Sequence, residues 1–201
     1  MTHATFWICF EKLTKSQESD AERSGVLRAN RSLCCLELGD HQQALAEAQR
    51  ATELRPGWAK AHFRLATAHK ALGSLGEARL AACAARRLAP DVAIEALLLE
   101  LRRELFAGCL GLGEALDTLE DFVVGPEKVR AAAQAVRDEL RGHEEQVLRA
   151  FMASAGPKTI FRRQNAMGDN WQEECRNGTM SLLSEISQSG EGPKFLDGRA
   201  V

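Results

Sequence analysis

Several features that would point to particular classes of protein are scarce or missing. The 201 residues include no tyrosine, and aromatic residues make up only 5% of the chain. Proteins that bind nucleic acids usually show a dense basic stripe with stacking aromatics, so this composition disfavours DNA and RNA as partners. The six cysteines contain no C-x-x-C pair, which argues against a zinc site or a disulfide framework and favours buried thiols in a reducing compartment.

Long apolar runs are also lacking. The apolar opening around Phe6, Trp7 and Ile8 is followed at once by Glu11 and Lys12, and no basic stretch precedes it. This pattern predicts neither a signal peptide nor a membrane anchor, and it favours a cytoplasmic protein. We also find no plausible Ser/His/Asp or Cys/His catalytic set, metal motif or phosphate-binding glycine loop. The expectation is therefore a protein that is not an enzyme and needs no cofactor.

What the sequence does contain is an internal repeat of 34 residues. Seven positions recur in register without a gap, and they are the pairs Leu38/Leu72, Gly39/Gly73, Ala44/Ala78, Ala48/Ala82, Ala51/Ala85, Leu54/Leu88 and Pro56/Pro90. A period of this length with small residues and a closing proline is typical of antiparallel helix pairs stacked in a solenoid. Such solenoids form a concave surface, so binding is a stronger expectation than catalysis.

The pattern predicts an all-α fold in which two helix pairs occupy residues 25–54 and 59–88. Turns at Gly39-Asp40 and Gly73-Ser74 divide each pair. A further helix from Asp91 to about residue 106 is placed to cover the last apolar face.

The rest of the chain is predicted to be helical in part. One helix is expected over residues 1–17, with a connection to Ser24, and others over roughly 113–123, 126–155 and 171–186. The predicted organisation is a remnant repeat helix with its connection (1–24), two repeats with a capping helix (25–106), a helical extension (107–187) and a disordered tail (188–201).

The repeat region is the positive part of the chain, because residues 24–90 hold ten Lys/Arg and five Asp/Glu. On the inner helix of each pair, three polar side chains are expected to converge: Asn30, Lys60 and Arg64. Lys60 and Arg64 are one helical turn apart, and Asn30 is expected to face them from the neighbouring helix. Two cations and an amide donor form a carboxylate site, with Leu33 and Phe63 beside it to pack against an apolar side chain of a peptide.

At these residues the chain resembles the tetratricopeptide repeat (TPR) family, and more narrowly its carboxylate-clamp branch of heat-shock co-chaperones. The stretches Ala29-Asn30-Arg31-Ser32 and Trp58-Ala59-Lys60-Ala61-His62-Phe63-Arg64 carry the resemblance, which covers about residues 5–106. It implies an adaptor that binds the C-terminal Glu-Glu-Val-Asp tail of the 70- or 90-kDa heat-shock chaperones. Asn30, Lys60 and Arg64 match three of the five clamp positions of that branch.

The two remaining clamp positions belong to a helix that the chain appears to lack, the first helix of the first repeat. The resemblance therefore implies a weakened site, because two charge-assisted contacts of roughly 1.5–3 kcal/mol each would be missing. The C-terminal half is expected to engage a client protein or second partner. The alternative is a structural TPR scaffold that mediates protein assembly without binding a chaperone tail, with the 126–155 helix in that role.

Overall fold

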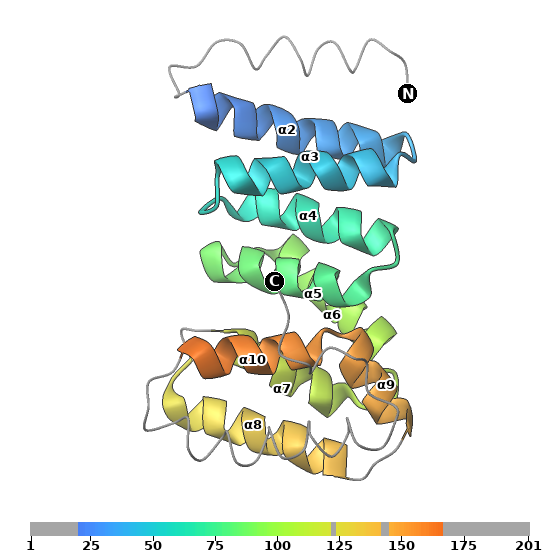
Figure 1. Cartoon of the computed structure of the whole chain (residues 1–201), viewed down its shortest axis with the longest axis vertical. Helices are drawn as coiled ribbons and strands as arrows, with labels where there is room; N and C mark the ends of the chain where they lie inside the picture. The colour runs from blue at the N-terminus through green and yellow to red at the C-terminus, as the bar shows by residue number, and fades with distance from the viewer. Residues whose placement is uncertain (1–19, 122–123, 142–144, 167–201) are drawn as a thin grey trace. The chain divides into compact units, whose positions relative to one another are not determined.

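The computed structural model describes residues 20–121, 124–141 and 145–166, and within this part of the chain every regular element is a helix (Figure 1). The elements are α2 (Asp20–Glu37), α3 (His41–Leu54), α4 (Ala59–Ala71), α5 (Leu75–Leu88), α6 (Val92–Leu105), α7 (Leu110–Glu120), α8 (Pro126–Arg141), α9 (Glu145–Ala153) and α10 (Gly156–Ala166). The chain divides into two compact units, residues 1–101 and 102–201. None of the described helices is both long and apolar enough to cross a membrane.

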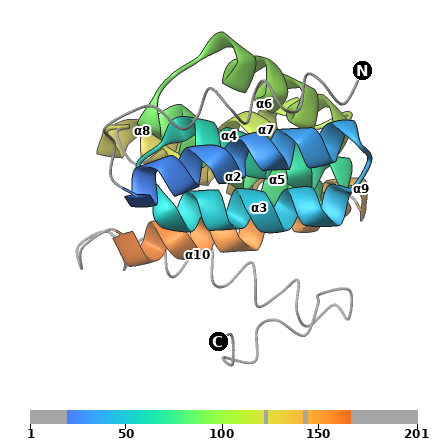
Figure 2. The same ribbon diagram turned by 90° about the horizontal axis from the view of Figure 1, so that it is seen from above.

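The first unit confirms the predicted all-α helical repeat. Helices α2 and α3 pack together as one pair and α4 and α5 as the next, while α3 and α2 both contact α4 (Figures 1 and 2). The predicted helix boundaries agree with the observed ones to within one residue for α3, α4 and α5. The stack therefore brings the first helices of the two pairs, α2 and α4, into contact with each other.

The turn inside each pair is built in the same way twice. Gly39 and Gly73 have φ angles of 79° and 74°, in the left-handed region that an L side chain rarely adopts. Behind them, the amide of Asp40 donates to the carbonyl of Cys35 at 2.9 Å, and the amide of Ser74 donates to the carbonyl of His69 at 2.9 Å. These bonds form the Schellman motif that ends a helix at a glycine, so the repeated glycine has a backbone role in each pair.

Burial separates the repeated residues into two groups. The repeated alanines are completely buried, whereas the repeated leucines at the helix ends are 37–80% exposed. Because alanine occupies little space, the backbones of adjacent helices can approach closely where it recurs. The buried set is Ala44, Ala48, Ala51, Ala78, Ala82 and Ala85, and the exposed set is Leu38, Leu54, Leu72 and Leu88.

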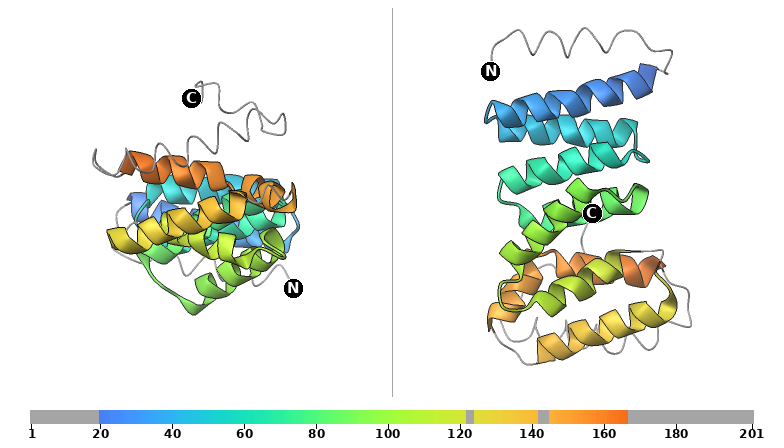
Figure 3. Two further views of the ribbon diagram at one scale, coloured as in Figure 1. Left: turned by 90° about the horizontal axis from the view of Figure 1, so that it is seen from below. Right: turned by 180° about the vertical axis from the view of Figure 1, so that it is seen from behind.

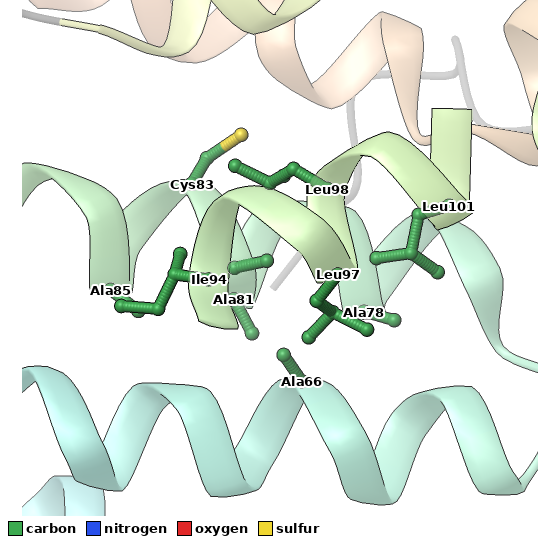
Figure 4. Close-up of a cluster of buried hydrophobic side chains, with 10 residues drawn as sticks. Ala66, Ala78, Ala81, Cys83, Ala85, Ile94, Leu97, Leu98 and Leu101 are labelled. Atoms are coloured by element: carbon green, nitrogen blue, oxygen red, sulfur yellow. The ribbon is translucent and has the colours of Figure 1, made fainter. Parts of the chain in front are cut away.

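Helix α6 covers the last pair, as predicted. Its apolar residues Ile94, Leu97, Leu98 and Leu101 form one buried cluster with alanines of α4 and α5 (Figure 4). The helix begins after Asp91, whose carboxylate accepts a hydrogen bond from the amide of Ala93 at 2.7 Å. The face that α5 would otherwise expose is thereby removed from water.

The second unit is a group of four short helices around its own core. Helix α7 contacts α8 and α10, and α9 contacts both α8 and α10 (Figure 3, where α8 is yellow and α10 orange). Ion pairs link its elements as well, because Arg102 lies 2.8 Å from the carboxylate of Asp117. The buried apolar residues of this core include Leu112, Leu116, Val129, Val136, Leu140, Phe151 and Ile160.

Three expectations differ from the structure. Helix α2 begins at Asp20, inside the stretch that we expected to be a connection. The polar residues there lie on a helical turn at the surface, where Glu22 is exposed, so their polarity did not indicate a loop. The single helix expected over 126–155 is instead α8 and α9, and a glycine, the weakest helix former after proline, stands between them at position 142.

Helix α10 is the third difference, since it begins at Gly156, well before the helix that we expected from about 171. The predicted helices over 1–17 and 171–186 and the predicted disordered tail lie outside the described residues.

Candidate peptide-binding site

The five residues of the predicted site lie on the first helices of the two pairs. Asn30 and Leu33 are on α2, and Lys60, Phe63 and Arg64 are on α4. Lys60 is exposed and the other four are half-buried. Asn30 and Arg64 are 34 residues apart and therefore occupy equivalent positions on two helices that contact each other. The convergence of Asn30 on the two cations stays a prediction.

The charges of Lys60 and Arg64 are not neutralised by any described residue. Neither side chain has a carboxylate partner within residues 20–121, 124–141 and 145–166. The third cation of α4, Lys70, does have one, because it forms an ion pair with Glu100 of α6. Two positive charges one helical turn apart thus remain available to an anionic ligand.

Arg64 is the more restricted of the two cations. Its Nε atom is buried and has no hydrogen-bond acceptor within the part of the chain that the structure describes. Burial lowers the pKa of its guanidinium from the usual value, although arginine stays charged at any ordinary pH. The guanidinium carbon lies 5.8 Å from the ring centre of Phe63. A donor that has lost water without gaining an acceptor stands to gain from a carboxylate.

Phe63 has two roles available to it. It packs against the buried cluster that α4, α5 and α6 share, so part of its ring belongs to the core of the first unit. The rest of the ring is accessible, because the side chain is only half-buried. Packing against the core fixes the ring beside Arg64, which is the arrangement that a firm apolar wall requires.

A buried carboxylate next to the site was missed from sequence. Glu47 of α3 is only 2% exposed and lies 2.9 Å from Arg28 and 3.7 Å from Arg31, the two cations that flank Asn30 on α2. The amide of Gln43 also donates to it, at 3.2 Å. The available signal was its place between the buried Ala44 and Ala48, on the face of α3 that packs against α2. Glu47 therefore joins α2 to α3 and neutralises the cations of α2.

The described residues contain no group of three or more His, Cys, Asp or Glu arranged to hold a metal ion. The chemistry that they do present is that of a cationic surface with an amide and apolar residues beside it. Such a surface binds carboxylates.

Comparisons with known proteins point in the same direction. No family model matches the chain, and no solved structure matches it. Among curated proteins, it is 38% identical over 68 residues to heat shock protein STI1 of Saccharomyces cerevisiae, which is 34% of this chain and 12% of that protein. It is 43% identical over 60 residues to the sti1 homolog of Schizosaccharomyces pombe, covering 30% of this chain and 10% of that protein.

A plant protein is similar to the same degree. The Hsp70-Hsp90 organizing protein of Triticum aestivum is 39% identical over 77 residues, which is 38% of this chain and 13% of that protein. About a third of this chain is thus homologous to STI1-type proteins. The chain spans only about a tenth of the length of these curated relatives. Their names connect the shared segment with the heat-shock machinery.

Proposed function

We propose that this chain is a non-enzymatic TPR adaptor that binds the acidic C-terminal tail of a heat-shock chaperone of the 70- or 90-kDa class. Lys60 and Arg64 pair with carboxylates of the tail and Asn30 donates a hydrogen bond to the same groups. Phe63 and Leu33 pack against an apolar side chain of the tail. The remaining helices, through residue 187, engage a client or a second partner.

The observation that carries this proposal is the unpaired state of Lys60 and Arg64. Within the described residues, the cations beside them on α2 and α4 have carboxylate partners in Arg28, Arg31 and Lys70, whereas these two have none. Leaving two charges and a buried Nε without acceptors costs stability, which a binding surface tolerates because its ligand supplies the acceptors. The homology to STI1 and to the Hsp70-Hsp90 organizing protein supports a chaperone as the source of that ligand.

The decisive experiment is a titration of the isotope-labelled chain with an eight-residue peptide ending in Glu-Glu-Val-Asp, followed by NMR up to millimolar concentration. We expect a dissociation constant between tens of micromolar and about one millimolar, since three polar groups supply the contacts. Substituting Lys60→Ala or Arg64→Ala should weaken binding at least about tenfold, the effect of one lost charge-assisted bond. Raising the salt from 50 to 300 mM should weaken binding by wild type and leave the variants nearly unchanged.

The matched control is Arg50→Ala, which removes one exposed cation from α3, the second helix of its pair. It changes the net charge by the same amount as Lys60→Ala, and it should leave peptide binding unchanged. Equal losses in Lys60→Ala and Arg50→Ala would show non-specific attraction and contradict the proposal. Absence of binding at millimolar peptide would instead favour a structural scaffold that holds partners by another surface.

A further inference from the structure

The ion pair between Lys70 and Glu100 borders the proposed site. Lys70 lies in the last turn of α4, and Glu100 is on α6, the helix that caps the stack. Their side chains are 26% and 55% exposed. The pair is thus an accessible carboxylate already bound to a cation of the helix that carries Lys60 and Arg64.

The order of side chains around α4 relates this pair to the site. At 100° per residue, Arg64 lies about 40° from Lys60 on one side, and Phe63 and Lys70 lie about 60° and 80° from it on the other. Phe63 packs against the cluster that includes α6, so this second side of α4 faces α6. A path over the surface of α4 therefore passes from Arg64 and Lys60 across Phe63 to Lys70 and ends at Glu100.

We infer that Lys70 is a further carboxylate subsite of this surface, which Glu100 fills until an acidic residue of the bound peptide replaces it. This inference rests on the proposed function and specifies its ligand. The occupant is an extended acidic peptide with one carboxylate at Lys60 and Arg64 and a second carboxylate upstream, at Lys70. Glu100 then limits affinity for peptides that lack the upstream acid less than for those that carry it.

The spacing of the two carboxylates follows from helix geometry. Arg64 and Lys60 precede Lys70 by six and ten residues, which at 1.5 Å per residue is about 9–15 Å along the helix axis. An extended chain spans about 3.3–3.6 Å per residue, so the upstream acid lies about three to five residues before the first. In a tail ending in Glu-Glu-Val-Asp, the first of the two glutamates stands three residues before the end.

Exchange at Lys70 is feasible because the carboxylate that leaves is exposed to water. Glu100 has no other partner within the described residues, and an accessible ion pair contributes little to stability. One carboxylate replaces another, so the charge of Lys70 stays balanced throughout. The peptide gains the contact and Glu100 returns to solvent.

The test is a double-mutant cycle between Lys70 and the upstream acid of the peptide. Wild type and Lys70→Ala are titrated with the Glu-Glu-Val-Asp peptide and with its Gln-Glu-Val-Asp counterpart. Wild type should bind the first peptide about two- to fivefold more tightly than the second, as expected for an accessible ion pair. Lys70→Ala should bind the two peptides equally. Peptides with a single upstream glutamate placed four or five residues before the end extend the series.

Glu100→Gln supplies the opposite result. Removing the competing carboxylate should tighten binding of the glutamate peptide about two- to fivefold and leave the glutamine peptide unchanged. Glu95→Gln, an exposed residue of the same helix, matches the change in net charge and should have no effect.

The inference is overturned if the glutamate-to-glutamine change costs the same in Lys70→Ala as in wild type, or if Glu100→Gln and Glu95→Gln act alike. Failure of the proposed function is a separate result: wild type then binds neither peptide, or Lys60→Ala binds both as well as wild type does.

Discussion

At the scale of single residues, Glu47 shows how the first unit sorts its charges. A carboxylate that is almost fully buried is stable only with cations beside it, and Arg28 and Arg31 supply them from α2. The same contacts draw these two cations away from the surface that carries Lys60 and Arg64. Which cations are neutralised is therefore decided by a residue outside the candidate site.

Replacing Glu47 with alanine should destabilise the protein by about 1–3 kcal/mol, because Arg28 loses its buried partner and only part of its guanidinium regains water. Urea denaturation followed by circular dichroism measures the change. Glu53→Ala serves as the control, since Glu53 is exposed on the same helix and its loss should cost less than about 0.5 kcal/mol. Equal costs at the two positions would contradict the role assigned to Glu47.

Cys35 gives a prediction about pH. Burial raises the pKa of its thiol, and the carboxylates of Asp40 and Glu47 raise that pKa further. The folded chain thus holds this proton more tightly than the unfolded chain does. The stability that this contributes is complete below the unfolded pKa, and it is lost as the pH rises through the folded pKa.

Alkylation of Cys35 should accordingly begin at higher pH in the folded protein than in the same protein in urea, because the thiolate is the reacting form. Mass spectrometry follows the reaction, and a Cys35→Ser variant assigns it to this residue. The prediction is wrong if the two pH profiles have the same midpoint.

At the scale of elements, the two turns within the helix pairs are alike in backbone and different in side chains. Asp40 accepts a hydrogen bond from the amide of Gln43 at 3.0 Å, so it caps α3. Ser74 stands at the equivalent position before α5 and makes no such side-chain bond. The sequence placed both turns, because glycine is the residue that the left-handed conformation requires. It did not distinguish a side chain that caps from one that does not.

The two turns make a matched pair for mutation. Asp40→Ala should cost about 1 kcal/mol of stability, the usual value of an N-cap bond, whereas Ser74→Ala should cost only a few tenths. Thermal unfolding of both variants against wild type gives the difference. Equal losses would mean that the cap at Asp40 contributes nothing to the stability of α3.

At the scale of the whole molecule, the first unit depends on α6 to complete it. Helical repeats are stabilised by their neighbours, so the last pair needs a cover for its apolar face. Leu98 is 1% exposed within the cluster between α5 and α6, and the next residue, Leu99, is 45% exposed. The two leucines are adjacent in sequence and differ in what surrounds them.

Leu98→Ala should therefore destabilise the first unit by about 2–4 kcal/mol, through lost burial and the cavity left behind. Leu99→Ala should change stability by less than about 0.5 kcal/mol. Hydrogen exchange gives a regional readout, since loosening of α6 should speed exchange in α4 and α5 in the first variant and not in the second. Similar exchange in both variants would show that α6 does not support the pair.

The sequence by itself determined the helical repeat and its turns. The spacing of 34 residues, the alanines that let helices approach and the glycines that end them are local signals with a direct physical meaning, and the buried alanines and the φ angles confirm them. It also placed the five candidate binding residues on two helices that pack together, because equivalent positions of a repeat lie on equivalent faces.

Only the tertiary structure decided which charges are neutralised. Lys60, Arg64 and Lys70 look alike in a sequence, and so do Glu47, Glu53 and Glu100. Whether each side chain has a partner depends on contacts between helices that are distant along the chain, such as those of Glu47 with Arg28 and of Glu100 with Lys70. Periodicity shows which face of a helix a residue occupies, whereas the packing of that face against its neighbours decides which of these charges are left for a ligand.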